Sequence, residues 1–533
     1  MLDQNRELRR TLGLSSVILF GLAYMTPMIV FGTFGVLAEA SQGTAAGAYL
    51  IALIAILLTA YSYGRMAAIY PIAGSAYTYT RRAFDGHVGF LVGWAVLLDY
   101  FFLPMVIWLI GAAYLQSAFP SVPGWGWILA FVVVTSAINI AGIAVADRIN
   151  LILMVVQFLI VAAFVGLAAR YVWIAAGPAG ILSAEPFFKP GVPFSATLAG
   201  AALAAYSFLG FDAITTLTEE TVEPQRTMPR AIMLVALVGG AIFIAAAYVT
   251  QLAHSGASFT NVDSAAYEIA KMIGGDIFKG LFLIGLIVAQ FASGISAQAS
   301  VGRLLFAMGR DGVLPRSLFG HLDPRLRTPV YNILLSGLVG LVGVGLDVAT
   351  STSFINFGAF TAFTFVNVSV IAHYMRRGTG GAGAGKARGG GWTGLLVPTL
   401  GATADLWLLV HLDRDALLLG LGWLAIGIVY LLFLTRLFRR PRRRSPSKRW
   451  PIDISHLPPS IGGVDHRGFV VPAARHMIDP LPLLPYRSIG TKAAQSARAR
   501  SRLGTAVRIW GRQLSSIRLT AQGADRGSVH GDC

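Results

Sequence analysis

Two aspartates lie inside segments of the chain that are otherwise apolar. Asp212 follows Gly210 in a run that begins near Thr197, and Asp99 lies well inside another apolar run. An aspartate at the centre of a membrane-spanning helix costs about 2.5–3.5 kcal/mol on insertion scales, so such residues commonly serve a substrate, an ion or a proton. Burial disfavours the charged form of a carboxyl until a cation arrives, which offers a route for exchanging a proton for an ammonium group.

Each aspartate has a functional and a structural interpretation. Asp99 has apolar neighbours on its own helical face, so its partner must lie on another helix, in solvent or in a ligand. It could exchange a proton, or pair with an ammonium group to which aromatic rings add cation–π contacts. The rings considered are Tyr100, Trp108, Phe208 and Phe211. The structural alternatives are an interhelical hydrogen bond from Asp99 to Asn139 or Gln157, and for Asp212 a carboxylate that caps a broken helix.

The composition indicates that these aspartates belong to a helical membrane protein. Of the 533 residues, 55% are hydrophobic and only 13% are charged, whereas soluble domains carry about 25% charged residues. About twelve apolar runs are long enough to cross a bilayer as helices, which predicts an all-α polytopic membrane protein. The expected spans are 13–37, 45–64, 88–117, 127–146, 149–172, 196–218, 230–252, 278–302, 329–347, 353–375, 393–411 and 416–437.

The net charge of +17 would suit a nucleic-acid-binding protein, but the location of the basic residues argues against that class. Nineteen of the 42 Lys and Arg residues lie at or after Arg436, and most others fall in alternate loops. The positive-inside rule then predicts a plasma-membrane protein with both termini in the cytoplasm. We expect a short N-terminal segment over 1–12 without a removable signal peptide, a membrane domain over 13–437, and a basic, largely disordered tail over 438–533. Basic residues beside the last span could also hold lipid headgroups.

Two of the expected spans contain residues that interrupt a helix. The first span carries Pro27 among several glycines, and the sixth carries Ser207, Gly210 and Asp212. Proline lacks an N–H donor and glycine weakens a helix. Two interrupted helices five spans apart predict a five-plus-five inverted repeat with broken helices one and six, a site at the midplane and two additional C-terminal helices. The alternative is a pair of kinked packing helices.

Several motifs resemble those of the amino acid–polyamine–organocation permeases over roughly residues 12–437. They are the segment Phe208–Asp212, the pair Glu219–Glu220, the run Glu223–Arg230, the loop Tyr70–Tyr79 and the stretch Gly302–Pro315. The run Gly89–Tyr100 is most similar to the putrescine-importer branch of that family. The resemblance implies a secondary-active permease that alternates between outward- and inward-open states around helices one and six.

The resemblance also implies where the substrate binds. The candidate substrate-binding residues are Tyr24, Met25, Thr26, Pro27, Asp99, Tyr100, Trp108, Ser207, Phe208, Gly210, Phe211 and Asp212, with Asp212 and Asp99 as the candidates for proton coupling. Many members of the family have a glycine-serine-glycine type of sequence at the break of helix one, whose amides bind a carboxylate. Here Pro27 has no amide donor, and Ile29 and Val30 are bulky, which favours an amine-bearing substrate.

Charged and polar residues elsewhere in the spans have narrower interpretations. The residues Glu219, Glu220, Glu223, Arg226 and Arg230 form either a salt-bridged gate or a solvated charge cluster of little energy. We expect Asn356, Asn367 and Gln290 to form interhelical hydrogen bonds rather than to contact a ligand. The histidines show no metal-ligand spacing and no phosphate-binding glycine loop is present, so no metal, cofactor or ATP-driven engine is expected.

The sequence therefore predicts a proton-coupled importer of a polyamine such as putrescine, or of an amino acid, working by alternating access. The expected partners are a small amine or amino acid, protons and membrane lipids. One alternative is a general permease for zwitterionic amino acids. A second is a membrane sensor that signals through its tail, which uptake after deletion of the tail would argue against. A membrane enzyme using Asp99 and Asp212 as an acid–base pair is disfavoured, because no nucleophile motif or metal cluster accompanies them.

Overall fold

The computed structural model describes residues 10–73, 75–141, 143–256, 258–310, 312, 314–323, 326, 328–378 and 392–435. All of these belong to the compact unit formed by residues 1–447. The predicted tail over 438–533, most of the N-terminal segment 1–12 and residues 379–391 lie outside the described residues. Within the described part the fold is all-α and contains no β-strand, as the composition predicts.

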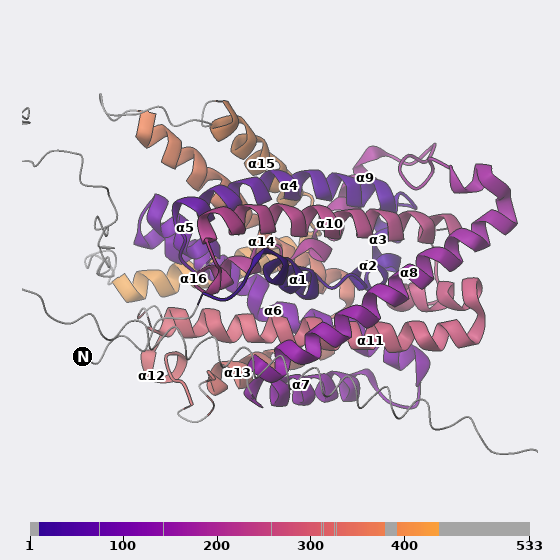
Figure 1. The fold of residues 1–533 in the computed structure, drawn as a ribbon, viewed down its shortest axis with the longest axis horizontal. Coiled ribbons are helices and arrows are strands. Elements are labelled where there is room, and N and C mark those ends of the chain that lie inside the picture. The colour runs from indigo at the N-terminus through magenta and orange to yellow at the C-terminus, as the bar shows by residue number, and fades with distance from the viewer. Residues whose placement is uncertain are drawn as a thin grey trace, which may run out of the picture. The chain divides into compact units, whose positions relative to one another are not determined.

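The helices follow one another along the chain as drawn in Figure 1. They are α1 (Leu14–Met25), α2 (Ile29–Gly32), α3 (Phe34–Ala40), α4 (Ala45–Ile69), α5 (Ser75–Ala83), α6 (Gly86–Ala118), α7 (Gly124–Ala141), α8 (Ile143–Ile181), α9 (Phe194–Ala204), η1 (Ala205–Phe208), η2 (Ala213–Glu220), α10 (Pro224–Ala253), η3 (Val262–Ser264), α11 (Ala265–Arg310), α12 (Arg316–Phe319), α13 (Val330–Gly340), η4 (Leu341–Gly345), α14 (Val348–Gly378), α15 (Trp392–Val410) and α16 (Arg414–Thr435).

Eleven helical segments of the described chain are long and apolar enough to cross a membrane. The remaining expected span, 329–347, forms an 11-residue α-helix, α13, followed by the five-residue 3₁₀-helix η4. Together they rise roughly 26 Å, slightly less than the thickness of the hydrocarbon core. Four glycines between Gly337 and Gly345 explain the shortening, because glycine disfavours the α-helix.

The first expected span, called helix one here, comprises α1, α2 and the start of α3 and is broken as the sequence predicts. The α-helix α1 ends at Met25, and the chain resumes as α2 only at Ile29. At the break Thr26 adopts a φ of +56°, which an L-residue rarely takes. Pro27, the next residue, has no N–H to continue the ladder of hydrogen bonds.

The sixth expected span, called helix six here, comprises α9, η1 and η2 and is distinct from α6. It is broken at the predicted residues as well. The α-helix α9 ends at Ala204, and the chain passes through η1 before it turns at Gly210 and continues as the 3₁₀-helix η2. Gly210 has a φ of +114°, and a Cβ placed there would lie 2.1 Å from the ring of Tyr24. Glycine is therefore required at this position both by its backbone conformation and by the closeness of helix one.

The broken helices lie inside the unit, and the last two helices lie at its periphery. The spans that contain the two breaks are 67% and 78% buried, whereas those of α15 and α16 are 28% and 22% buried. Figure 1 shows α1 beside α10, which it contacts along with α11. The long helix α6 contacts α11 and α14. The positions of both predicted aspartates are thereby shielded from the surface of the unit.

Candidate functional site

Asp212 lies at the break of helix six, and only one of its two carboxyl oxygens is hydrogen-bonded to side chains. Its Oδ2 atom accepts hydrogen bonds from Ser75 Oγ at 3.2 Å and from the hydroxyl of Tyr100 at 3.1 Å. Its Oδ1 atom is buried and has no hydrogen-bond partner. The side chain makes no capping hydrogen bond to η2, which it precedes. The carboxyl group is therefore held by two side chains from other helices and retains one free acceptor.

Asp99 lies on α6 with a free acceptor of its own. Its side chain is 4% exposed, its Oδ1 atom has no hydrogen-bond partner, and its charge interacts with that of Asp212. The proposed structural partner Asn139 donates instead to the carbonyl of Ile295 and to Gln298 Oε1 on α11. The hydrogen bond from Asn139 that would have satisfied Asp99 structurally is thus not formed.

Three tyrosines surround the two carboxyl groups. Tyr24 at the end of α1, Tyr63 on α4 and Tyr100 on α6 all interact electrostatically with both Asp99 and Asp212. Tyr24 packs its ring on Gly210, and Tyr63 lies with its ring centroid 5.6 Å from that of Phe211. These rings come from α1, α4 and α6, and they meet Gly210, Phe211 and Asp212 at the break of helix six. The site therefore exists only when these four segments are assembled.

A proline adds a further acceptor next to Asp99. Pro104 lies within α6, four residues after Tyr100. Because proline has no N–H, the backbone carbonyl of Tyr100 lacks its usual intrahelical donor. The residues of the site therefore include two carboxyl groups and a backbone carbonyl without its intrahelical donor, and oxygens of these kinds can receive the N–H groups of an ammonium ion.

The break of helix one offers few amide donors. The N–H of Thr26 bonds to the carbonyl of Leu22, that of Ile29 bonds to the carbonyl of Thr26, and Pro27 has none. The hydroxyl of Thr26 donates to the carbonyl of Ala23 at 3.1 Å. A carboxylate would thus find few free donors here, in agreement with the departure from the glycine-serine-glycine pattern.

Among the described residues, four of the other predicted site residues contact groups other than the two carboxyl groups. Met25 lies against Gly239 on α10, and Trp108 lies against Gly294 and Gly340. Ser207 bonds to the hydroxyl of Tyr49 at 2.9 Å, and the ring of Phe208 packs on Phe243 with a centroid distance of 5.3 Å. Only a conformational change or a ligand of some length would connect them with Asp99 and Asp212.

Sequence reasoning missed Ser75 and Tyr63 as parts of the site. Ser75 begins α5 with a φ of +48° and donates to Asp212. It lies within the loop motif quoted above, where its small hydroxyl could have indicated a functional role, whereas its strained backbone is visible only in the structure. Tyr63 carried no such signal, because an aromatic residue in an apolar span is ordinarily a packing residue.

The predicted gate residues lie at the end of helix six near the chain's first described residues. Glu223 and Arg226 form an ion pair at 3.5 Å with both side chains exposed. Glu219 accepts from the backbone N–H of Ala73 at 3.4 Å, and the backbone carbonyl of Glu220 accepts from Leu12. Arg230 is exposed on α10. An exposed ion pair contributes little energy, so this group ties segments together mainly through the backbone.

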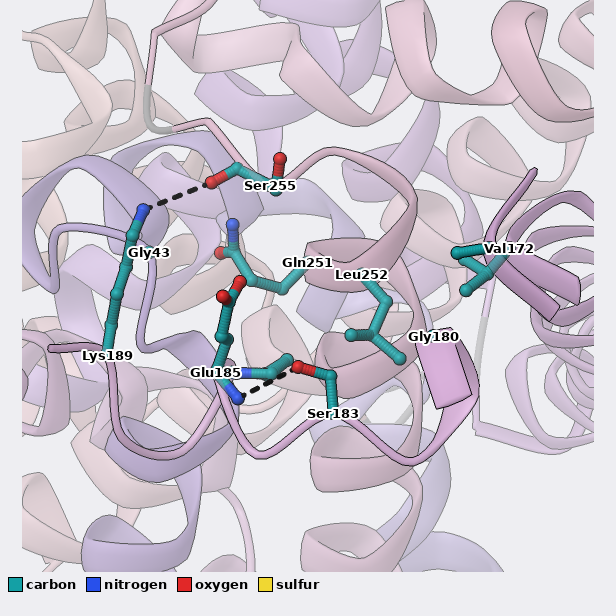
Figure 2. A pocket seen from close by; sticks show the side chains of 11 residues that line it. Gly43, Val172, Gly180, Ser183, Glu185, Lys189, Gln251, Leu252 and Ser255 are labelled. Carbon is teal, nitrogen blue, oxygen red and sulfur yellow. Dashed lines mark hydrogen bonds between the residues drawn. The ribbon is translucent and has the colours of Figure 1, made fainter. Parts of the chain in front are cut away.

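A separate pocket lies at the C-terminal end of α10. It encloses about 180 Å³, and its lining includes Gly43, Glu185, Lys189, Gln251 and Ser255. Figure 2 shows Lys189 reaching the carbonyl of Ser255 across the pocket at 3.3 Å. Helix α10 begins beside the N-terminal segment, and its residue Gln251, about 40 Å further along the axis, lines this pocket. None of the predicted site residues lines it.

The residues that the structure describes include no cluster of three or more His, Cys, Asp or Glu side chains that could hold a metal ion. The candidate site is instead formed by two carboxyl groups, three phenol hydroxyls and one serine. Oxygen acceptors at fixed positions in a buried space suit the recognition of a small organic cation.

The model of the family described as amino acid permease matches residues 12–446. The chain belongs to the amino acid permease family. The match covers both broken helices and every residue of the candidate site, so the permease assignment rests on the part of the chain that carries the chemistry.

The permease is similar to several characterised transporters. It is 41% identical over 436 residues to the low-affinity putrescine importer PlaP of Escherichia coli, covering 82% of this chain and 96% of that protein. It is 26% identical to the branched-chain amino acid permease BcaP of Bacillus subtilis, covering 80% of this chain and 94% of that protein. It is 30% identical to mouse cationic amino acid transporter 4, covering 68% and 60% of the two chains. All three relatives are transporters, and none is named as an enzyme.

Proposed function

We propose that this permease is a proton-coupled, secondary-active importer of a diamine such as putrescine. The observation that carries the proposal is the pair of buried carboxyl groups, Asp99 and Asp212, each with an oxygen that lacks a hydrogen-bond partner. Neither forms an ion pair with a Lys, Arg or His among the described residues. Two buried acceptors without a protein cation are stabilised either by a proton or by a cation from outside, which are the two species that a proton-coupled amine importer exchanges.

The kinds of hydrogen-bonding groups in the site favour an amine over a zwitterion. An ammonium group has three N–H donors, which Asp99, Asp212 and the carbonyl of Tyr100 can receive. The carboxylate of an amino acid would need donors at the break of helix one, where the amides of Thr26 and Ile29 are already bonded and Pro27 has none. The similarity to the importer PlaP, whose name specifies putrescine, supports the same substrate class.

The proton in this proposal is carried by Asp212. A buried carboxyl group is more stable neutral when no cation is present, and more stable ionised when an ammonium group lies beside it. Binding of the substrate and release of the proton are then linked at one residue. The hydroxyl of Tyr100 and Ser75 Oγ hold the carboxyl group in place during both states.

Import of an amino acid is the second candidate function. It is favoured by the similarity to BcaP and to cationic amino acid transporter 4, whose names specify amino acids. A cationic amino acid could still place its side-chain ammonium group between Asp99 and Asp212. It would lack a matching site for its carboxylate at Pro27.

Uptake into proteoliposomes distinguishes these candidates. We expect labelled putrescine to accumulate when the inside is more acidic than the outside, because Asp212 returns to the outside with a proton taken from the inside. Excess unlabelled diamines should compete strongly. Zwitterionic amino acids of similar length should compete weakly, because the break of helix one offers few free amide donors for a carboxylate. Competition by leucine that equals competition by diamines would reject the diamine assignment while leaving the permease family untouched.

We further propose that the N-terminus faces the cytoplasm, because basic residues concentrate in alternate loops. After Cys533, the only cysteine, is replaced by serine, a single cysteine at Ser121 or Thr379 can report the orientation. An impermeant thiol reagent applied to intact cells should label Ser121→Cys and spare Thr379→Cys. Labelling at residue 379 from outside would reverse the proposed orientation.

A further inference from the structure

A third buried aspartate lies outside the candidate site, on the first of the two C-terminal helices. Asp405 on α15 is fully buried, although its helix lies mostly at the periphery. Its Oδ2 atom accepts from Thr59 Oγ1 on α4 at 2.8 Å and from Asn367 Nδ2 on α14 at 2.9 Å. Asn367 Nδ2 also contacts Thr59 Oγ1 at 3.0 Å. The three side chains join three helices that are distant in the sequence, and they confirm the interhelical bonding expected of Asn367.

The remaining side-chain oxygens of Asp405 and Asn367 are buried without partners. Neither Asp405 Oδ1 nor Asn367 Oδ1 has a hydrogen-bond partner. Two acceptors cannot satisfy each other, but a proton on Asp405 Oδ1 supplies the missing donor. A carboxylic acid and a primary amide can then pair through both of their polar atoms. An ionised Asp405 would leave a charge and two acceptors buried at a cost of several kcal/mol.

Charged groups on the packed helices lie too far along the chain to neutralise Asp405. Arg65 on α4, His373 on α14 and His411 on α15 each lie six residues from Thr59, Asn367 and Asp405 respectively, about 9 Å along the helix axis. Arg65 donates to the hydroxyl of Tyr374, and the ring of His411 bonds to the carbonyl of Trp407. Helix α9, which also contacts α15, carries no charged residue.

Little space remains for a metal ion beside the amide. A Cβ placed on Gly401, one turn before Asp405, would lie 2.7 Å from Asn367 Oδ1. The amide oxygen therefore packs directly on the backbone of α15. This close packing leaves room for a proton on Asp405, whereas a hydrated or partly hydrated cation would have to separate the helices.

The same two helices hold the break of helix six one turn away. Tyr63 follows Thr59 by four residues on α4, and Phe363 precedes Asn367 by four residues on α14. The ring centroids of Tyr63 and Phe363 lie 5.8 Å apart, and each lies within 5.6 Å of the ring of Phe211. Phe211 immediately precedes Asp212, so the spacing of α4 and α14 sets the position of the proposed coupling residue.

We propose that Asp405 is a permanently protonated carboxyl group that clamps α4 and α14 behind Phe211 and thereby positions Asp212. The acid acts through its shape and its hydrogen-bonding pattern, and its charge plays no part. It is a positioning residue outside the substrate path. This inference concerns the state of Asp405 and holds whichever amine or amino acid the permease transports.

Two substitutions at the same position separate the clamp from a charge. Asparagine preserves both the acceptor and the donor of a protonated acid, so Asp405→Asn should transport putrescine within about twofold of the parent. Leucine removes both bonds, and Asp405→Leu should raise the half-saturation concentration roughly tenfold. Equal damage by the two substitutions would show that an ionised carboxylate, or a cation bound to it, is needed, and would overturn the proposal.

A matched control separates positioning from a general loss of stability. Asn139→Leu also removes a buried interhelical amide, but its partners Ile295 and Gln298 lie on α11. Both leucine variants should lower the thermal midpoint, and only Asp405→Leu should alter half-saturation. If both variants shift half-saturation alike, Asp405 is merely a structural residue. Thr59→Val removes the bonds of Thr59 Oγ1 to Asp405 and Asn367 but keeps the bond between Asp405 and Asn367. It should produce a smaller shift and serves if Asp405→Leu fails to fold.

Infrared spectroscopy tests the proton directly. The difference spectrum between the parent and Asp405→Asn should contain the carbonyl stretching band of a protonated carboxyl. This band should stay constant across the range of pH in which the protein is folded, and on addition of putrescine. A spectrum that shows only carboxylate bands at this difference would exclude the protonated clamp, regardless of any transport result.

Discussion

Replacement of Asp212 by asparagine should abolish the response of putrescine uptake to an imposed pH gradient while the protein remains folded and inserted. The amide keeps the acceptor that Ser75 and Tyr100 contact, but it cannot release a proton. With one proton per cycle, a gradient of one pH unit can support about tenfold accumulation of a substrate. The variant should accumulate none beyond equilibration of the substrate.

The measurement compares initial uptake and final accumulation in proteoliposomes with and without an acid interior. Asp405→Asn is the matched control, because it makes the same chemical change at another carboxyl buried in the membrane domain and should keep the response to the gradient. Binding of labelled putrescine to the detergent-solubilised variants verifies that the protein is intact. A pH response in Asp212→Asn equal to that of the parent would remove Asp212 from coupling and leave Asp99 as the candidate.

Replacement of Asp99 by asparagine should weaken the binding of a diamine far more than that of a neutral competitor. Removing one partner from a buried ion pair commonly costs several kcal/mol, which corresponds to about a hundredfold loss of affinity or more. An uncharged analogue of the same length, without amine groups, makes no ion pair, so its affinity should change by only about threefold. The difference arises because Asp99 is 4% exposed and solvent cannot screen its charge.

Competition against labelled substrate measures both affinities in one series. The matched control is Asp263→Asn. Asp263 lies in η3, whose Ser264 bonds to Ser117 at the C-terminal end of α6, 18 residues after Asp99, so the loss of Asp263 should affect neither ligand. Parallel losses for the charged and the neutral competitor in Asp99→Asn would mean that Asp99 shapes the site without pairing with the ligand. The diamine proposal would then rest on Asp212 alone.

The sequence predicts the breaks of helices one and six well, because local backbone chemistry decides them. Pro27 lacks an N–H. At position 210 only glycine fits the φ of +114° and the close approach of the Tyr24 ring. These properties belong to single residues and do not depend on what packs nearby. The position of Asp99 and Asp212 inside apolar spans is equally visible, because an aspartate in such a run needs no partner to be noticed.

The partners of those aspartates could not be predicted from the sequence. Ser75 and Tyr100 reach Asp212 from α5 and α6, and Thr59 reaches Asp405 from a helix 346 residues earlier in the chain. Trp108 and Phe208, which were candidates for contact with the substrate, face other helices instead. Rings on an apolar helix give no indication of which neighbour they will meet.

Periodicity explains this division. In a soluble helix the apolar stripe marks the buried face, and the rotation of the helix can be inferred from the sequence. In a membrane both the lipid-facing and the core-facing sides are apolar, so the pattern fixes the length of α6 or α4 but leaves its rotation about the axis undetermined. The sequence therefore determined the class, the spans, the breaks and the buried carboxyl groups. Only the packing of the helices decided which hydroxyl, ring or amide lies beside each carboxyl, because that choice depends on helix rotation.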